Sequence, residues 1–375
     1  MDQATKRTWA EISLPDLEHN YRALRGMLPR GCRFLGVVKA NAYGHGAVPV
    51  ARKLEQLGAE YLAVACLNEA VELRQAGIAA PILILGPTPA PFAGELLQYD
   101  LTQTVQDMDE ARALSEAAGK ADKPLKVHIK VDTGMSRLGF LCDEDHVDLA
   151  AEEILALGAL PYLQTEGLFT HFANADGDEA YTMRQLTRFL NIGEKLAAGG
   201  LEIKIRHCAA SAAVLHYPCT HLDMVRPGIA LYGHYPDPSC EGLDGPGLLP
   251  VMTLKTRIAA VRELPAGTCI SYGCTYTLER DSRLAVLPIG YADGLERLLS
   301  NRGEVLVHGQ RAPILGRVCM DMCLVDVTDL PAAVGDEVTV FGSELPIEEK
   351  AAAVGTIQYE LLCGVSGRVP RVYLD

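Results

Sequence analysis

The sequence predicts an α/β protein in which an N-terminal, parallel (β/α)8 barrel is followed by a mostly β C-terminal domain. Eight short apolar runs alternate with amphipathic stretches over the first two-thirds of the chain. After about residue 245, short runs rich in β-branched residues take their place. Eight parallel strands are the number that closes such a barrel, and an open doubly wound sheet is the alternative.

Each of the eight runs has the length and the apolar character of a buried strand. They cover residues 34–39, 61–66, 82–86, 101–105, 125–132, 166–172, 203–207 and 224–232. Between them, residues 68–76 and 108–118 place apolar side chains on one helical face, and each stretch is followed by a glycine. Ser13 and Pro15 are typical of the start of a first helix.

A Gly/Pro-rich connector at residues 242–250 separates the two predicted domains, which we place at residues 14–245 and 246–375. Residues 1–13 contain a strand-like segment and are a candidate addition to the second domain. The strands expected in the second domain cover residues 254–261, 284–289, 304–308, 317–327 and 337–341.

Composition excludes several classes of protein. The formal net charge of -14 argues against nucleic-acid binding, which needs a basic surface. The eleven cysteines are scattered and odd in number, which favours free thiols in the cytoplasm over disulfides or a metal site. We see no secretory signal and no uncharged apolar run near the ~20 residues of a membrane span, so we expect neither export nor membrane insertion.

Lys39 ends the first apolar run and precedes a glycine-rich loop. In a β/α barrel this end of each strand faces the active site. Burial of a lysine amine lowers its pKa and makes it nucleophilic, as Schiff-base chemistry with a carbonyl cofactor requires. The ordinary alternative is a lysine that emerges into solvent as its strand ends.

Other strand ends also carry polar groups. Lys130 and Asp132 close the fifth run, where a buried ion pair that stabilises the barrel is the structural alternative. Ser211 follows the seventh run in a small-residue helix start, which suits a phosphate and equally suits a routine helix cap. Arg226 and Gly228 in the eighth run offer a guanidinium and a backbone N–H to an anion. Taken together, these groups predict a site.

Eight motifs, in this order along nearly the whole chain, resemble those of alanine racemases, which are pyridoxal-phosphate enzymes. They are VVKANAYGHG (37–46), KVDTGMSRLG (130–139), THFANAD (170–176), RPGIALYG (226–233), SYGCTY (271–276), GYADG (290–294), GRVCMDM (316–322) and TIQYE (356–360). The resemblance implies interconversion of L- and D-alanine with pyridoxal 5'-phosphate, and supply of D-alanine for peptidoglycan.

The same resemblance implies roles for individual residues. Lys39 holds the cofactor as a Schiff base and acts as one catalytic base, and Tyr272 from the partner subunit of a homodimer is the other. The resemblance places five residues at the phosphate: Tyr43, Ser211, Gly228, Ile229 and Tyr359. It places Arg226 at the pyridine nitrogen with His171 near the ring, and Arg137 and Met320 at the substrate carboxylate. It also implies that Lys130 is a carbamylation site that positions Arg137, and that Tyr291 lies in the entrance corridor.

The chemistry is consistent with these roles. Racemisation removes a proton from one face of a carbon and returns one to the other, so two bases are natural. An arginine at the pyridine nitrogen is always charged and only donates, so it disfavours a protonated pyridine and restrains side reactions such as transamination. One departure is visible, because Ala210 stands where the family commonly has asparagine, which puts the detail of the phosphate site in question.

Three other functions remain open. Serine or broader amino-acid racemisation uses the same scaffold, although the bulk of Tyr359 favours alanine. A basic amino-acid decarboxylase shares the architecture but matches the second-domain motifs poorly. A non-catalytic pyridoxal-phosphate-binding protein has no use for a second base, so the SYGCTY and GRVCMDM segments argue against it.

Overall fold

The computed structural model describes residues 7–237, 240 and 247–375. The chain divides into two compact units. The barrel unit consists of Glu18–Ala42 and Ala47–Leu248, and the β unit consists of Met1–Leu17, Tyr43–Gly46 and Leu249–Asp375. Each unit is described by itself.

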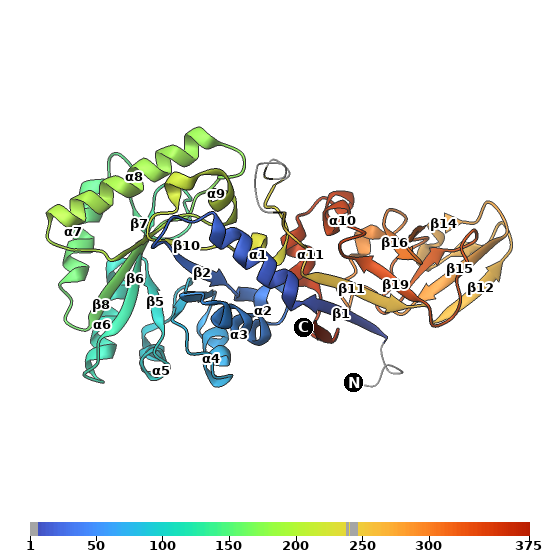
Figure 1. Ribbon diagram of the computed structural model, residues 1–375, viewed down its shortest axis with the longest axis horizontal. Coiled ribbons are helices and arrows are strands. Elements are labelled where there is room, and N and C mark those ends of the chain that lie inside the picture. Colours follow the sequence, from blue (N-terminus) through green and yellow to red (C-terminus); the bar gives the residue numbers. More distant parts are fainter. Residues whose placement is uncertain (1–6, 238–239, 241–246) are drawn as a thin grey trace. The chain divides into compact units, whose positions relative to one another are not determined.

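The sheet of the barrel unit contains eight parallel strands in sequence order among the described residues (Figure 1). They are β2 (Arg33–Val37), β3 (Tyr61–Val64), β4 (Ile82–Ile84), β5 (Thr102–Val105), β6 (Leu125–Asp132), β8 (Leu163–Phe169), β9 (Ile205–His207) and β10 (Met224–Val225), and the short β7 (Phe140–Leu141) pairs with β6. The last strand, β10, pairs with the first, β2, and a bridge from Ala210 to Arg226 follows β9 and β10. The sheet is therefore a nearly closed barrel, and the predicted (β/α)8 fold is confirmed.

Helices surround this sheet because both of its faces need apolar cover. Strand β4, for example, is buried along its whole length. The helices are α3 (Ala47–Leu57), α4 (Leu67–Gln75), α5 (Ala93–Gln98), α6 (Met108–Gly119), α7 (Val147–Gly158), α8 (Glu179–Ala198) and α9 (Ser211–His216), with the 3-10 turns η2 (Ala90–Phe92), η3 (Pro218–Thr220) and η4 (Ile229–Tyr232). Helix α1 (Leu14–Gly26) begins in the β unit and continues in the barrel unit.

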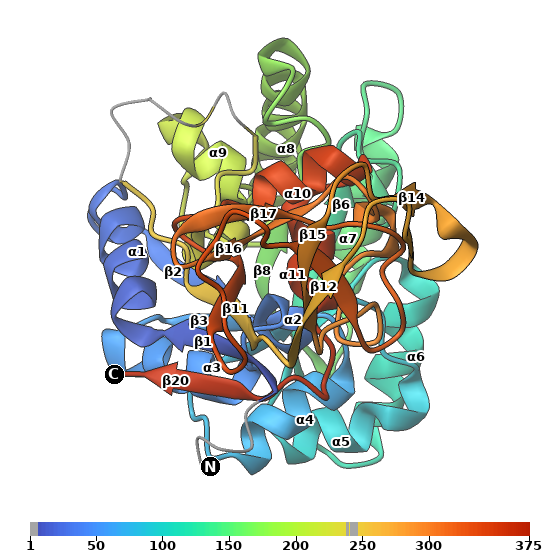
Figure 2. The same cartoon turned by 90° about the vertical axis from the view of Figure 1, so that its right-hand side faces the viewer.

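The β unit is built on a sheet with the strand order β17-β16-β19-β11-β1-β20, of which Figure 2 labels β17, β16, β11, β1 and β20. Its strands are β1 (Thr8–Ser13), β11 (Met252–Arg257), β16 (Glu304–Val307), β17 (Gln310–Pro313), β19 (Glu337–Phe341) and β20 (Arg371–Leu374). The strand-like segment at residues 8–13 therefore belongs to this sheet, where it runs antiparallel to β11 and parallel to β20. The second half is mostly β, as predicted.

Two smaller sheets complete the β unit. One contains β12 (Ala260–Leu264), β15 (Ser282–Leu287) and β18 (Cys323–Asp326), and the other is the hairpin of β13 (Cys269–Ile270) and β14 (Tyr276–Thr277). A buried cluster includes Ile270 of this hairpin together with Leu278, Leu284 and Leu315. The helical segments are α10 (Ile347–Val354), α11 (Gln358–Gly364), η6 (Tyr272–Cys274) and η7 (Arg297–Leu299).

Membrane insertion can be examined on the helices that the structure describes. Not one of these helices has both the length and the apolar character that crossing a bilayer requires.

Candidate active site at the strand ends

The prediction that Lys39 is the last residue of a strand is wrong. Strand β2 stops at Val37, and the half-buried Lys39 begins a turn labelled α2 (Lys39–Tyr43). Residues 40–43 all have left-handed backbone angles, with φ between 52° and 54°. None of them is glycine, and each such residue costs roughly 1–2 kcal/mol. Strain of this kind is concentrated at functional sites, so the turn itself marks a candidate.

Two polar side chains hold this turn in the barrel unit. The Glu69 carboxylate accepts hydrogen bonds from the N–H groups of Ala40 and Ala65, both at 2.7 Å. The Asn41 side-chain oxygen accepts one from the N–H of Ala47 at 2.8 Å. Because Ala65 directly follows strand β3, Glu69 ties the turn that carries Lys39 to the neighbouring strand end.

Arg226 lies just after β10 and is almost fully buried, with 4% of its surface exposed. Its guanidinium bonds to groups at the ends of two other strands, β8 and β9. The partners are His207 Nδ1 at 2.9 Å, the carbonyl oxygens of Thr170 and Cys208 at 2.9 and 3.2 Å, and His171 Nδ1 at 3.3 Å. The structure therefore brings together the predicted residues Arg226 and His171.

These contacts determine the protonation of both histidines. A guanidinium can only donate, so Nδ1 of His171 and Nδ1 of His207 must accept, and each ring carries its proton on Nε2. Burial, reinforced by the positive charge of Arg226, lowers the pKa of both histidines well below the ordinary value. Burial also lowers the pKa of Arg226, to about 10, which still leaves it a cation at neutral pH.

The network continues into the barrel. His207 Nε2 lies 2.9 Å from Nδ1 of His128, so the first donates to the second. Burial lowers the pKa of His128 to about 3, so this ring is also neutral. The Phe169 ring stacks on His207 with centroids 4.8 Å apart, and it also faces the Arg226 guanidinium. Arg226 is thus held by a directed chain of neutral rings.

Ser211 begins α9 at the end of the segment that follows β9. Its hydroxyl oxygen accepts hydrogen bonds from the N–H of Gly228 at 2.9 Å and from the N–H of Ala230 at 3.2 Å. These two backbone donors fix the Ser211 oxygen in place and leave its hydroxyl proton as the group that could donate to an anion. Ile229, also predicted to bind phosphate, is buried between those two donors.

Lys130 and Asp132 lie at the end of β6 without the ion pair that was one interpretation of the sequence. Among the described residues, Lys130 Nζ donates to the Val131 carbonyl at 3.1 Å. Asp132 instead accepts the N–H groups of residues 134–137, at 2.9–3.0 Å. These N–H bonds keep the pKa of Asp132 below its ordinary value despite burial, and they shape the loop that carries the exposed Arg137.

Two predicted phosphate residues belong to the β unit. Tyr43 is buried, and burial raises the pKa of its phenol. Its ring packs against that of Tyr359 on α11, with centroids 6.2 Å apart. The five residues predicted at the phosphate thus form two groups, one within each unit.

Three further predicted residues lie on the surface of the β unit. Tyr272, Met320 and Tyr291 are 70%, 53% and 44% exposed. The loops of Tyr291 and Met320 are joined, because the N–H of Tyr291 donates to the Cys319 carbonyl at 3.0 Å. Arg368 bonds to Asp293 and Asp321 at 2.7 Å each and so bridges the same two loops.

Sequence reasoning missed several residues of this site. His207 was noted only as a strand end, His128 was not noted, and Ala230 contributes a backbone donor that no side-chain pattern reveals. Two buried histidines on strands that both pair with β8, His128 on β6 and His207 on β9, were a detectable signal. The loop-shaping role of Asp132 was also readable, since Asp followed by Thr-Gly is typical of such a turn.

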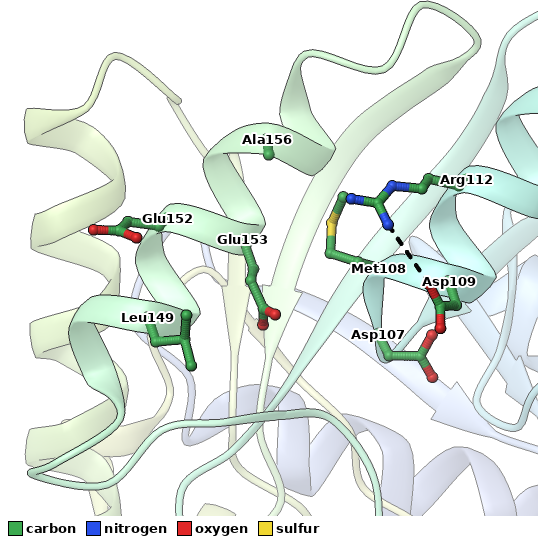
Figure 3. A pocket seen from close by; sticks show the side chains of 8 residues that line it. All are labelled: Asp107, Met108, Asp109, Arg112, Leu149, Glu152, Glu153 and Ala156. Carbon is green, nitrogen blue, oxygen red and sulfur yellow. Dashed lines mark ion pairs between the residues drawn. The ribbon is translucent and has the colours of Figure 1, made fainter.

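A hollow of about 450 Å³ opens outside the barrel between α6 and α7 (Figure 3). Four carboxylates and one arginine line it, and Arg112 pairs with Asp109 at 3.6 Å. None of the predicted site residues is among those that line it. Within the described residues, no group of three or more His, Cys, Asp or Glu side chains could hold a metal ion.

Comparison with known proteins agrees with this geometry. Residues 12–236 match the model of the alanine racemase N-terminal domain, and residues 251–373 match that of the alanine racemase C-terminal domain. The alanine racemase of Desulforamulus reducens is 50% identical over 371 residues, which are 98% of both chains.

Solved structures give the same result. The alanine racemase of Clostridium difficile 630 is 41% identical with a TM-score of 0.94, covering 99% of this chain and 97% of the other. The same racemase in complex with cycloserine is 40% identical with a TM-score of 0.92, covering 99% and 96%. Both halves match in the same order, and this chain belongs to the alanine racemase family.

Proposed function

We propose that this protein interconverts L-alanine and D-alanine with pyridoxal 5'-phosphate as its cofactor. Membership of the alanine racemase family supports the reaction. The observation that carries the proposal is the buried guanidinium of Arg226, held between neutral histidines at the end of a barrel strand.

The residues at the strand ends fit this cofactor. Among the described residues, the contacts of Arg226 use Nη1 and Nη2, which leaves Nε for a further acceptor. A donor-only cation suits an unprotonated pyridine nitrogen. The Ser211 hydroxyl, whose oxygen accepts the N–H groups of Gly228 and Ala230, keeps its own proton and can donate it to a phosphate oxygen. The amine of Lys39 supplies the group that binds the cofactor aldehyde covalently.

When bound, pyridoxal phosphate supplies the conjugated system that makes the α proton of an amino acid acidic. The protein supplies the bases and the positioning. We assign the Lys39 amine to the proton on one face of the α carbon and the Tyr272 phenol to the proton on the other. Two bases are needed because one group cannot take a proton from one face and return it to the opposite one.

The substrate carboxylate is assigned to Arg137, with the backbone N–H of Met320 as a second donor. A guanidinium binds a carboxylate through two parallel hydrogen bonds, which fixes the orientation of the α carbon between the two bases. His171 is assigned to the cofactor ring, where its proton on Nε2 remains available as a donor. Tyr43, Ile229 and Tyr359 are assigned to the phosphate, and Tyr291 to the entrance corridor.

We further propose a homodimer in which each active site receives Tyr272 from the partner subunit. The 70% exposure of this side chain at a hairpin tip supports an intersubunit position. We propose D-alanine supply for peptidoglycan as the role and the cytoplasm as the location. None of the eleven cysteines, all of them described residues, forms a disulfide, which suits a reducing compartment.

The test measures D-alanine formation from L-alanine by the purified protein, with D-serine formation from L-serine beside it. We expect alanine to be the better substrate. The Lys39→Ala variant should lose activity together with the absorption band of the lysine-bound cofactor. Lys120→Ala, at an exposed lysine on the surface, is the matched control and should keep both. An unchanged band in Lys39→Ala would disprove the assignment of Lys39.

A further inference from the structure

One arginine near the end of the chain joins two segments of the β unit. Arg371, the first residue of β20, donates four hydrogen bonds through its guanidinium, and all four acceptors are backbone carbonyl oxygens. The acceptors are Gly44 at 2.9 Å, Val365 and Ser366 at 2.6 Å each, and Val369 at 2.7 Å. The proposed reaction assigns no role to Arg371, so this arrangement needs a separate account.

Three of these acceptors belong to the segments that carry Tyr43 and Tyr359. Gly44 directly follows Tyr43. Val365 and Ser366 directly follow α11, and Tyr359 lies on this helix. The carbonyl end of a helix carries partial negative charge, so a cation at the C-terminus of α11 is favourable. One guanidinium therefore ties the residue after Tyr43 to the end of the helix that carries Tyr359.

Close packing of the backbone sets the distance between these two segments. Gly44 has a φ of 83°, and a Cβ atom at this position would lie 2.3 Å from the carbonyl oxygen of Leu362 on α11. Glycine alone meets both conditions, so the loop after Tyr43 lies directly against the helix. In this arrangement the ring centroids of Tyr43 and Tyr359 are 6.2 Å apart.

Strand β20 gives Arg371 a firm base. All four of its residues, 371–374, pair in parallel with β1 in the largest sheet of the β unit. Tyr373 contacts the same loop as Arg371, because its hydroxyl donates to the His45 carbonyl at 3.2 Å. Residues two apart on a strand point to the same face of the sheet. Two neighbouring side chains of one paired strand therefore hold the loop that begins at Tyr43.

We propose that Arg371 is a positioning residue for the cofactor phosphate, because it holds Tyr43 at the spacing from Tyr359 that lets both phenols bind one phosphate group. The inference rests on the proposed assignment of these two tyrosines to the phosphate. The ligand is a phosphate monoester dianion, whose oxygens accept several hydrogen bonds at once. Arg371 itself binds carbonyl groups of the protein and acts on the phosphate only through the tyrosines.

The fork of a guanidinium suits this task. Its nitrogens donate in fixed and diverging directions, so one side chain binds Gly44 on one segment and Val365 on the other at the same time. A lysine ammonium is a compact point charge without this planar fork. Substitution of Arg371 by lysine would therefore keep the positive charge near the end of α11 and lose the link to the loop.

Loss of this link should weaken binding through the phosphate alone. A hydrogen bond to a charged group contributes about a factor of ten to an affinity, so displacement of one phenol should raise Kd about tenfold. Pyridoxal has the same aldehyde and ring as pyridoxal 5'-phosphate but lacks the phosphate. Its affinity should therefore not depend on Arg371.

The test titrates the full-length apoprotein with pyridoxal 5'-phosphate and, separately, with pyridoxal, and follows the absorption band of the lysine-bound aldehyde. We expect Arg371→Met and Arg371→Lys to raise Kd for pyridoxal phosphate about tenfold and to leave Kd for pyridoxal unchanged. If Arg371→Met does not fold, Arg371→Lys decides the question, because it retains the charge. Arg262→Met, at an exposed arginine of the same unit, is the matched control and should bind both ligands like the wild type.

A double-mutant cycle separates positioning from a general loss of structure. If Arg371 acts through Tyr43, Arg371→Lys should add little to the loss of affinity that Tyr43→Phe causes. An equal loss of affinity for both ligands, an unchanged affinity for pyridoxal phosphate, or losses that simply add would overturn the assignment of Arg371. A wild-type protein that binds neither ligand would instead overturn the proposed function, on which this assignment rests.

Discussion

At the end of the barrel strands, Arg226 is 4% exposed and bonds to four described acceptors, whereas Tyr272 in the β unit is 70% exposed on a turn of left-handed residues. The neighbours of Arg226 hold its guanidinium in one position. Tyr272 has no buried partner that fixes its ring within the residues described. The comparison teaches that one half of the candidate chemistry is preorganised within the barrel, whereas the proposed second base lies exposed on a turn of the β unit.

Replacement of the exposed base should give the largest effect on rate. We expect Tyr272→Phe to lower kcat about 10²–10⁴-fold, because it removes one of the two proposed proton carriers and little else. The unfolding temperature should stay unchanged, since the hydroxyl faces solvent in a single chain. Tyr276→Phe on the same hairpin is the control and should keep its activity. A large fall in stability for Tyr272→Phe would mean that the tip is fixed in ways the single chain does not reveal.

Mixed dimers sharpen this comparison further. If Lys39 and Tyr272 of one site come from different subunits, co-expression of Lys39→Ala with Tyr272→Phe generates hybrid dimers in which one of the two sites is intact. Random pairing should then restore about a quarter of the wild-type activity. Each variant alone should remain inactive or nearly so. No restoration in a confirmed hybrid dimer would place Tyr272 in the site of its own chain.

Replacement of the buried cation should instead lower stability. Arg226→Met leaves His171, His207 and two carbonyl groups without their donor, and unpaired buried acceptors are costly. Removal of a desolvated charge offsets part of this loss, so we expect a decrease of about 2–4 kcal/mol in the free energy of unfolding. Urea denaturation of the apoprotein measures it. Arg30→Met, at an exposed residue of the same unit, should leave the free energy nearly unchanged.

The sequence predicted the barrel strands but not the turn that follows the first of them. Every barrel strand was predictable, because buried parallel strands are continuous apolar runs whose ends carry the polar groups. The turn after Lys39 was not, since four consecutive non-glycine residues in the left-handed region contradict their local preferences. The tertiary bonds from Glu69 and Asn41 hold that turn, and no local pattern encodes them.

Within the site, the groups that touch the cofactor by resemblance were predictable, whereas the residues that hold them were not. Arg226 and His171 stand in motifs, but His207, which accepts a hydrogen bond from Arg226 and donates to His128, becomes adjacent to Arg226 only when β9 and β10 close the barrel. Asp132 was first considered as a partner for Lys130. Four backbone N–H groups take its oxygens instead, a competition that depends on the three-dimensional path of the loop.

Lys130 offers the most specific test of the site in the barrel unit, and the expected effect is the smallest of those considered. Burial, with the positive charges of Arg226 and Arg137 in addition, lowers its pKa from 10.5 to about 7. The neutral amine, which alone adds to carbon dioxide, is therefore the minor form below pH 7 and the major form above it. The cations that disfavour an ammonium also favour the carbamate anion that would replace it. We expect the carbamate signal in ¹³C NMR with labelled bicarbonate to grow as the pH rises from 6 to 8.

The same group links pH to stability. Between pH 7 and 10.5 the unfolded chain binds the Lys130 proton and the folded chain does not, so this residue makes the free energy of unfolding rise with pH across that window. Lys130→Met should abolish both the carbamate signal and this contribution, whereas Lys126→Met, at a half-exposed lysine on the same strand, should preserve them. A carbamate signal that persists in Lys130→Met, or that does not change from pH 6 to 8, would show that the barrel does not hold this amine in the desolvated position on which the comparison depends.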